Sequence, residues 1–322
     1  MTEPEKISLQ AEIPEELDGA RLDQAAAKLF ATYSRSRLKL WIEAGELTVD
    51  GQSQRPRQKV REGQVVRIET ELDAPDEWEP QKIDLNVVYE DDHIVLINKP
   101  AGFVVHPGAG NWSGTLLNGL LHRYPELAQI PRAGIVHRID KDTTGLMVVA
   151  RTLRSHTRLV RQLEKRNMTR QYEAVTQGVM VGGGTVNKPM GRHPVHRKKM
   201  AVIEHGGKPA VTHYRVVKRF RTHTHIRVQL ETGRTHQIRV HMAHIRYPLL
   251  GDPVYLGRSR LPAGGTPEFK ETMLRFGRQA LHAKFLAFEH PDTGEWMEWE
   301  IPLPDDMLAL IEVLNEDKRD HE

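Results

Sequence analysis

Two polar segments of the chain carry side chains that could take part in a chemical reaction. The first, residues 137–145, contains Asp140, whose carboxylate can act as a nucleophile or as a general base. The second, residues 232–239, contains Arg234 and further cationic groups, which can bind an anion. On residue type alone, Asp140 is equally explained by a turn or a helix cap, and Arg234 by a phosphate contact or a surface ion pair. Tyr172 on its own is an ordinary strand aromatic.

Other catalytic chemistries have weaker support in the sequence. The absence of cysteine excludes disulfides, thiolate nucleophiles and cysteine-ligated zinc or iron–sulfur centres. The glycines at 108 and 110 lack the last glycine of the dinucleotide-binding fingerprint, and neither a Gly-Lys-Ser/Thr phosphate loop nor a Gly-x-Ser-x-Gly elbow occurs. His236, His241 and His244 could share one helical face, but no glutamate is placed as in the His-Glu-x-x-His zinc motif. We therefore do not expect a metal site.

Apolar segments flank both polar segments and indicate which elements would position them. Residues 146–150 form an apolar strand after the first segment, and alternation of Ile226, Val228 and Leu230 predicts a half-buried strand before the second. Functional side chains often lie on loops at strand ends. Further strands are predicted over 85–89, 94–98, 172–177, 281–288 and 296–301, and helices over 116–121, 153–163 and 305–314. Strands in hairpins with interspersed helices predict an α+β fold with a mixed, mainly antiparallel sheet flanked by helices.

Residues 18–71 have the pattern of a small, separate α/β unit. Apolar residues recur at helical spacing over 22–30 and over 38–42, and Asp50-Gly51 is a strong hairpin signal between short strands. A cluster of cations would lie on or just before the second helix, where phosphate contacts are easily made. These cations are Arg35, Arg37 and Lys39.

Residues 72–82 separate this unit from the rest of the chain. They are rich in acidic side chains and contain Pro75 and Pro80, which is typical of a linker. The predicted boundaries are therefore 18–71 for the small domain, 72–82 for the linker and 83–322 for one larger domain.

The charge distribution predicts an anionic partner. The formal net charge is only +3, but residues 1–20 carry −5 and residues 289–322 carry −10, so residues 21–288 carry +18. A field of this size attracts polyanions, and we infer that the partner is a nucleic acid. No apolar run approaches the roughly 20 residues of a membrane-spanning helix. Residues 1–20 also lack a signal-peptide pattern, so we expect a cytoplasmic protein without a membrane partner.

Several short motifs, taken together, resemble the RluA-type family of pseudouridine synthases. Residues 137–145 are similar to the family's catalytic signature, 170–174 to the segment with its active-site tyrosine, and 232–239 to its arginine motif. The remaining motifs that resemble the family lie at 89–92, 98–102, 106–108, 280–283 and 290–291, and residues 18–71 resemble an S-four-type RNA-binding domain. Ile139 and Thr144 depart from the usual leucine and serine, and neither change removes a reacting group.

The resemblance implies an enzyme that isomerises uridine in RNA to pseudouridine without a cofactor or a metal. It implies that Asp140 is the nucleophile, that Tyr172 stacks on the uracil, and that Arg234 pairs with the Asp140 carboxylate. It further implies that Arg138 helps to hold the opened RNA helix and that Leu281 packs near the base. The target base would be flipped out of its stack, which costs a few kcal/mol.

The order and spacing of the motifs are closest to the family's D branch, which implies a ribosomal substrate. The expected partner is clustered uridines of large-subunit (23S) rRNA, either free or in a pre-ribosomal large subunit, and we expect a monomer. The alternative interpretation is a non-catalytic RNA-binding factor for ribosome assembly, which the charge would suit equally well. The complete set of Asp140, Tyr172 and Arg234 favours the enzyme. A metal-dependent phosphodiesterase would require clustered acidic ligands, which the sequence does not offer.

Overall fold

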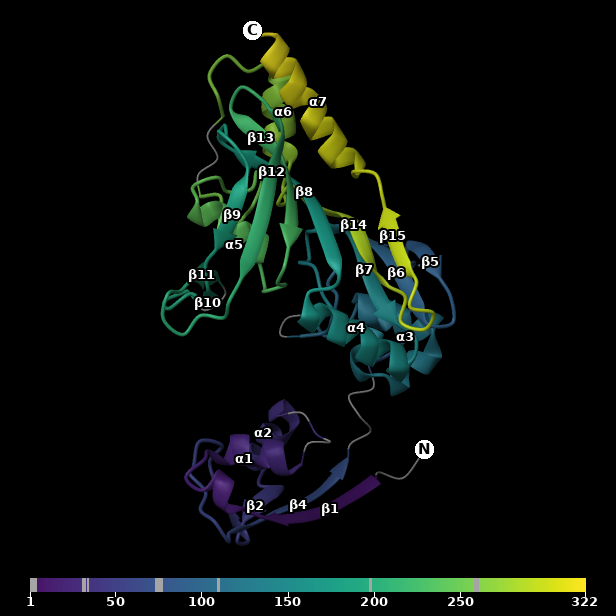
Figure 1. Cartoon of the computed structure of the whole chain (residues 1–322), viewed down its shortest axis with the longest axis vertical. Helices are drawn as coiled ribbons and strands as arrows, with labels where there is room; N and C mark the ends of the chain where they lie inside the picture. The colour runs from purple at the N-terminus through teal and green to yellow at the C-terminus, as the bar shows by residue number, and fades with distance from the viewer. Residues whose placement is uncertain are drawn as a thin grey trace. The chain divides into compact units, whose positions relative to one another are not determined.

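The chain forms two compact units. The computed structural model describes residues 5–30, 33, 35–72, 78–108, 111–196, 199–257 and 261–322. The units are Met1–Glu77 and Trp78–Glu322 (Figure 1), and each is described here by itself. The division falls within the expected linker, of which residues 73–77 lie outside the described residues.

Residues 78–82 pack on the larger unit. The backbone amide of Gln81 donates a hydrogen bond to the carbonyl of Asn118 at 3.0 Å, and the Asn118 side chain donates to the carbonyl of Glu79 at 2.9 Å. The Gln81 side chain accepts a further bond from the amide of Gly114 at 2.7 Å. This part of the expected linker therefore belongs to the larger unit.

In its described residues the smaller unit is a four-stranded antiparallel sheet with two α-helices and one short 3-10 helix. Its strands are β1 (Glu5–Glu12), β2 (Leu47–Val49), β3 (Gln52–Ser53) and β4 (Val65–Leu72), in the order β1-β4-β2-β3. Its helices are η1 (Glu15–Leu17), α1 (Leu22–Leu29) and α2 (Arg35–Ala44), and their apolar faces form one core with the sheet. The expected turn at Asp50-Gly51 is confirmed, because both residues have positive φ and join β2 to β3. Strand β1 was not predicted, yet it pairs with β4 along its whole length.

A nine-stranded sheet organises the larger unit (Figure 1). Eight strands follow the order β5-β6-β7-β14-β8-β13-β12-β9, and β15 pairs with β14. Only the pairing of β7 with β14 is parallel, so the predicted mixed and mainly antiparallel sheet is confirmed. The strands are β5 (Val87–Glu90), β6 (Ile94–Lys99), β7 (Thr144–Ala150), β8 (Thr169–Gln177), β9 (Gly184–Asn187), β12 (Val211–Arg219), β13 (His223–Leu230), β14 (Leu281–Glu289) and β15 (Trp296–Glu300).

Helices and a small hairpin surround this sheet. The helices are α3 (Leu116–Arg123), η2 (Pro125–Gln129), η3 (Pro131–Gly134), α4 (Leu153–Lys165), α5 (Gln237–His244), α6 (Pro267–Arg275) and α7 (Asp305–Arg319). Strands β10 (Met190–Arg192) and β11 (Met200–Val202) form a separate two-stranded sheet. Strands β9 to β12 and helix α6 had no sequence prediction. In the described part of the chain, no helix is both long and apolar enough to cross a membrane.

Strand β7, which follows Asp140, is buried on both faces. Met147 and Val149 contribute to the core beneath α3, whereas Leu146 and Val148 contribute to the core beneath α4. Burial on both faces explains why the sequence shows a continuous apolar run here instead of an alternation. The loop with Asp140 therefore leads directly into the interior of the domain.

A buried carboxylate on β8 predicts a loss of stability in acid. Glu173 accepts hydrogen bonds from Nε2 of His225 at 2.7 Å and from Nζ of Lys284 at 3.0 Å. Burial alone would raise the pKa of Glu173, but these bonds and charges outweigh burial and lower its pKa from 4.5 to about 2. Since the pKa is lower in the folded state, its stabilising contribution is present above about pH 4.5 and is lost as the pH falls towards 2.

We therefore expect the stability difference between the wild type and Glu173→Gln to shrink in acid. The difference should decrease by roughly 3 kcal/mol between pH 5 and pH 2, as the shift in pKa requires. Urea unfolding of both proteins across this pH range measures it. Parallel pH profiles for the two proteins would contradict the assignment.

Candidate active site

One cleft in the larger unit collects the expected residues of the catalytic domain. Its volume is about 1150 Å³, and its walls come from the loop before β7, from β8, from the start of β14 and from the segment between β13 and α5. The expected site residues that line it are Arg138, Asp140, Tyr172, Arg234 and Leu281. Segments far apart in the sequence thus converge on one place.

Buried polar side chains form hydrogen bonds with the loop that carries Asp140 and hold its backbone in place. Nζ of Lys99, at the end of β6, donates to the carbonyl of Lys141 at 2.7 Å. The amide of Gln279 donates to the hydroxyl of Thr143 at 3.0 Å. The Asp140 carbonyl closes the turn by accepting the Thr143 amide at 3.1 Å. The Asp140 side chain is therefore presented to the cleft from a fixed backbone.

The side chain of Lys99, which contacts this loop, is fully buried. Burial lowers the pKa of Lys99 to about 7, and the charges of Asp142 and Asp140 only partly oppose that shift. The ammonium group also donates to the carbonyl of Pro100 at 2.7 Å. Lys99 is a positioning residue, because it reaches the loop through the backbone of Lys141 and not through the Asp140 carboxylate.

Arg239 is the ion-pair partner of Asp140. Its Nη1 lies 3.0 Å from Oδ2 of Asp140, and its Nε and Nη2 bind both carboxylate oxygens of Asp252 at 2.7 and 2.9 Å. Burial alone would lower the pKa of Arg239, but the bonds to Asp252 and the charge of Asp140 outweigh burial and raise its pKa. The guanidinium is therefore permanently charged, and it stabilises the negative charge of Asp140, whose side chain is only 16% exposed.

The expected pairing of Asp140 with Arg234 is wrong. The Arg234 side chain is exposed, and its Nε donates to the carbonyl of Pro209 at 3.1 Å. Arg234 lies before helix α5, whereas Arg239 lies on the buried face of that helix, with 5% of its side chain exposed. The start of the helix at Gln237 decides which arginine faces the carboxylate. Arg234 instead fits the phosphate-contact interpretation of its residue type.

Two further side chains complete the surroundings of the carboxylate. Nε2 of His236 lies 3.9 Å from Oδ1 of Asp140, and its Nδ1 is hydrogen-bonded to the Tyr255 hydroxyl at 2.8 Å. Burial lowers the pKa of His236, although the charge of Asp140 partly opposes this. The guanidinium of Arg239 also lies over the Tyr255 ring, 5.1 Å from its centre. Tyr255 therefore contacts both Arg239 and His236, the two side chains beside the Asp140 carboxylate.

Tyr172 and Leu281 form an apolar part of the cleft wall. They lie on the adjacent strands β8 and β14, and both are almost fully buried. Burial raises the pKa of Tyr172, so its phenol keeps its proton at neutral pH. A flat apolar surface next to a carboxylate suits a planar, uncharged ring as the ligand.

Exposed cations lie around this apolar wall. Arg138, Arg166 and Arg234 all line the cleft and all are exposed. Arg166 is paired with Glu231 at 2.6 Å. Arginines at the mouth of a cleft are suited to bind phosphate groups. The cleft therefore combines an anion-binding rim with a carboxylate in its interior.

Two of the histidines considered as metal ligands have other hydrogen-bond partners. His236 is bonded to Tyr255, whereas His241 is bonded to Thr212 and to the carbonyl of Lys188. In the described residues no group of three or more His, Asp or Glu side chains is arranged to hold a metal ion.

The smaller unit has a second, basic groove. Lys39 lines it together with Arg55 and Arg57, and the side chain of Lys39 also forms an ion pair with Glu43 at 3.2 Å. Helix α2 contains Arg35 and Arg37 as expected, but the side chains of these two residues lie outside the described residues.

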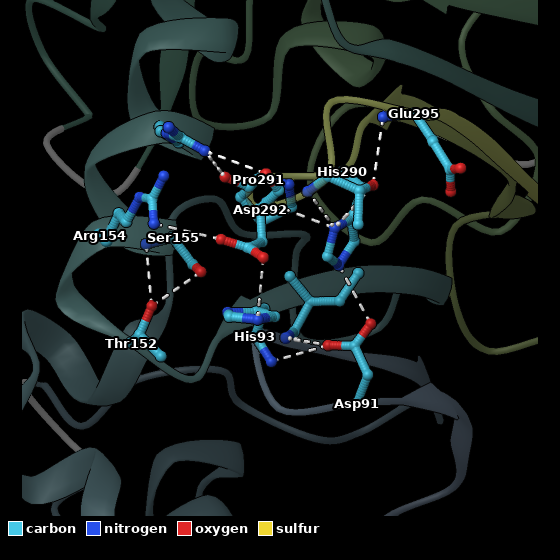
Figure 2. A network of polar contacts seen from close by, with 12 residues as sticks. Asp91, His93, Thr152, Arg154, Ser155, His290, Pro291, Asp292 and Glu295 are labelled. Carbon is cyan, nitrogen blue, oxygen red and sulfur yellow. Dashed lines mark hydrogen bonds and ion pairs between the residues drawn. The ribbon is translucent and has the colours of Figure 1, made fainter.

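Two of the motifs that resemble the family lie far from this cleft. In Figure 2, His290 contacts Asp91 at 3.1 Å and His93 contacts Asp292 at 3.4 Å. This network joins the turn before β6 to the turn after β14, at the end of β7 opposite to the loop with Asp140. The motifs at 89–92 and 290–291 therefore hold strands together and do not contribute to the cleft.

Sequence reasoning missed several residues of the site. Arg239 was inside the arginine motif but was not selected, and Lys99 was inside another motif without a role. Asp252 and Tyr255 follow α5 in an irregular segment that had no prediction. The only sequence signal for these residues is a charged side chain with no obvious surface role. That signal does not identify the group with which the charge pairs.

Two family models match the chain. The model for RNA pseudouridylate synthase matches residues 93–244, and the model for the S4 domain matches residues 20–66. The first span contains Asp140, Tyr172 and Arg239, and the second lies within the smaller unit.

Curated relatives and solved structures are similar to the chain over most of its length. The chain is 58% identical over 312 residues to ribosomal large subunit pseudouridine synthase D of Pseudomonas aeruginosa, with 97% of each chain covered. It is 55% identical over 318 residues to the protein of the same name from Escherichia coli strain K12, covering 98% of this chain and 97% of the other. The structure of human RNA pseudouridylate synthase domain containing 4 is similar with a TM-score of 0.57 and 25% identity, covering 71% of this chain and 93% of the other.

Proposed function

Because the chain belongs to the RNA pseudouridylate synthase family and is therefore an isomerase, we propose that it converts uridines of large-subunit (23S) ribosomal RNA to pseudouridine, with Asp140 as the nucleophile. The relatives that are 55–58% identical to it are named ribosomal large subunit pseudouridine synthase D. The observation that carries the role of Asp140 is its contact with Arg239 at 3.0 Å inside a cleft that also contains Tyr172.

The reaction needs an ionised carboxylate next to the nucleoside. The bond between ribose C1′ and uracil N1 breaks, the uracil turns, a bond between C1′ and C5 forms, C5 loses a proton and N1 gains one. Attack on C1′, attack on the base and a glycal route all begin from a carboxylate anion. Arg239 donates a hydrogen bond to the Asp140 carboxylate, and its own position is fixed by Asp252. Tyr172, a protonated phenol, supplies a surface on which the uracil stacks.

The burial of Tyr172 and Leu281 supports base flipping. Both side chains are almost fully enclosed, so a uracil can reach them only after it has left its stack in the RNA. Unstacking costs a few kcal/mol, and contacts of Arg138 and Arg234 with flanking phosphates would offset that cost. We propose a monomer as the active form. The site of action would be the cytoplasm, on rRNA or on a pre-ribosomal large subunit.

Pseudouridine mapping of rRNA tests this proposal. Cells that lack the protein should lose pseudouridine at a small cluster of uridines in a stem-loop of large-subunit rRNA, and the wild-type protein should restore it. Asp140→Asn should not. A ribosome-assembly factor without activity would leave the pseudouridine map unchanged, and that result would contradict the proposal.

The basic groove of the smaller unit predicts part of the salt dependence of RNA binding. Replacing Lys39, Arg55 and Arg57 together by Gln should make the slope of log affinity against log salt shallower by about 2, since each phosphate contact contributes about 0.7 to 0.9. Turnover on saturating RNA should change less than about twofold, because the replaced groups act through binding alone.

A matched triple variant distinguishes the contribution of the groove to the salt slope from that of the overall charge of the smaller unit. Lys28, Arg61 and Arg67 are exposed cations of the same unit that do not line the groove. Their replacement by Gln should leave the slope within experimental error of the wild type. Equal effects of the two triple variants would mean that the groove is not a binding surface.

A further inference from the structure

Arg170 is a buried cation in the wall of the cleft. It lies on β8 two residues before Tyr172, so both side chains are on the same face of the sheet, roughly 7 Å apart along the strand. It is only 7% exposed. Neither of the roles assigned above to cleft arginines, pairing with Asp140 or binding phosphates at an exposed rim, applies to it.

The guanidinium of Arg170 has few hydrogen-bond partners. Its Nη2 makes one long hydrogen bond, 3.4 Å, to the carbonyl of Glu231, and its buried Nε has no partner. Within the described part of the chain no carboxylate forms a salt bridge with it. The carboxylate of Glu231, whose carbonyl it contacts, is bound by Arg166 and His213. Burial lowers the pKa of Arg170, as expected for a charge without a counter-ion.

The other buried arginines differ from it. Arg239 binds Asp252 through two hydrogen bonds, and Arg278 binds Asp306 through two bonds of 2.6 and 2.8 Å. Buried arginines are normally paired in this way, because an unpaired buried charge costs several kcal/mol. A buried arginine that lacks such a partner and lines a cleft is therefore a candidate for binding a ligand.

The cleft wall leaves room for this guanidinium. A Cβ atom at position 233 would lie 2.7 Å from Nη1 of Arg170, so a side chain larger than glycine at Gly233 would displace it. Gly233 and Arg170 both line the cleft. The ring of His137, close to Arg170, stays neutral because burial and the Arg170 charge lower its pKa to about 3. His137 therefore adds no second positive charge beside Arg170, and no carboxylate of the described residues is paired with Arg170.

We propose that Arg170 is a catalytic residue that donates hydrogen bonds to a carbonyl oxygen of the flipped uracil and stabilises its negative charge. This inference rests on the proposed function. When the C1′–N1 bond breaks, its electron pair remains on the uracil and is shared between N1 and the carbonyl oxygens, while C1′ is taken by the Asp140 carboxylate. The charge returns to the Asp140 carboxylate when C5 bonds to C1′ and the bond between C1′ and that carboxylate breaks. C5 then loses a proton and N1 gains one. A fixed donor aimed at a charge that develops during the reaction accelerates that step.

The depth of Arg170 favours the base over a phosphate as its ligand. Arg138 and Arg234 are exposed at the cleft, where the RNA backbone would pass under the proposed function. Arg170 is buried beside Tyr172, where the base would stack. A buried hydrogen-bond donor that interacts mainly with charge developing during the reaction should affect kcat much more than the affinity for RNA.

Arg170→Met tests the proposal, because methionine fills the space without any donor. We expect kcat on rRNA transcript to fall by about a hundredfold or more, as for loss of one oxyanion donor, with KM within about threefold. The thermal midpoint should stay equal or rise, because an unsatisfied buried charge is removed. Arg170→Lys should recover part of the lost kcat.

Two binding measurements identify the ligand. Affinity for RNA with an abasic residue at the target position, and for the uridine RNA, should both stay within about threefold of the wild type, with an unchanged salt slope. An equal loss of affinity for both RNAs, with a slope shallower by about 1, would mean that Arg170 binds a phosphate and would overturn the proposal. A lower thermal midpoint with retained kcat would show a structural role and would also overturn it. An inactive wild type would instead refute the proposed function.

Discussion

Asp140→Asn is expected to abolish pseudouridine formation while RNA binding survives. Asparagine keeps the size of the side chain, but it carries no negative charge and is a poor nucleophile. The loss should exceed about ten-thousandfold in rate, equivalent to about 5.5 kcal/mol. Arg239 would keep both bonds to Asp252, so the surroundings of the site should stay folded.

The decisive measurement compares pseudouridine yield on an rRNA transcript for the wild type and Asp140→Asn. Each protein is assayed with and without a chelator, beside an RNA-binding assay and a thermal unfolding curve. The chelator should have no effect on the wild type. Substantial yield from a folded Asp140→Asn would mean that the nucleophile is misassigned, and loss of wild-type activity with chelator would reopen the metal alternative.

Arg239→Lys is expected to lower kcat by about a hundredfold or more, whereas Arg234→Lys should change kcat less than about fivefold. Lysine keeps the charge at position 239 but cannot make the three bonds that Arg239 makes to Asp140 and Asp252. At position 234 the side chain is exposed and is bonded only to a backbone carbonyl, so a lysine should serve almost as well.

The two variants are measured for kcat, KM and thermal midpoint. Complete removal of Arg239 is less informative, because it would leave Asp252 buried without a counter-charge, at a cost of about 3–5 kcal/mol. If Arg239→Lys does not fold, Arg239→Gln combined with Asp252→Asn removes both charges and provides a folded comparison. A loss of kcat in Arg234→Lys as large as that at position 239 would return the pairing role to Arg234.

Much of the fold could be predicted from local sequence patterns. The strand over 146–150 and the helix over 153–163 were predicted correctly as parts of β7 and α4, because hydrophobic periodicity acts between near neighbours in the chain. The hairpin at Asp50-Gly51 was predicted for the same reason, since its conformation depends on two residues. The resemblance of several motifs to a known family placed Asp140 and Tyr172 in one expected site.

The partners of each charged group were decided only by the tertiary structure. Arg234 and Arg239 are both plausible partners for Asp140 in the sequence, and the choice depends on where α5 begins and which face of it is buried. The contact of Lys99 with the loop requires the pairing of β6 with β7. Local sequence patterns specify helices and strands. An ion pair, or a buried charge without a partner such as Arg170, depends on residues that are distant in sequence and are brought together by packing. No local pattern contains that information.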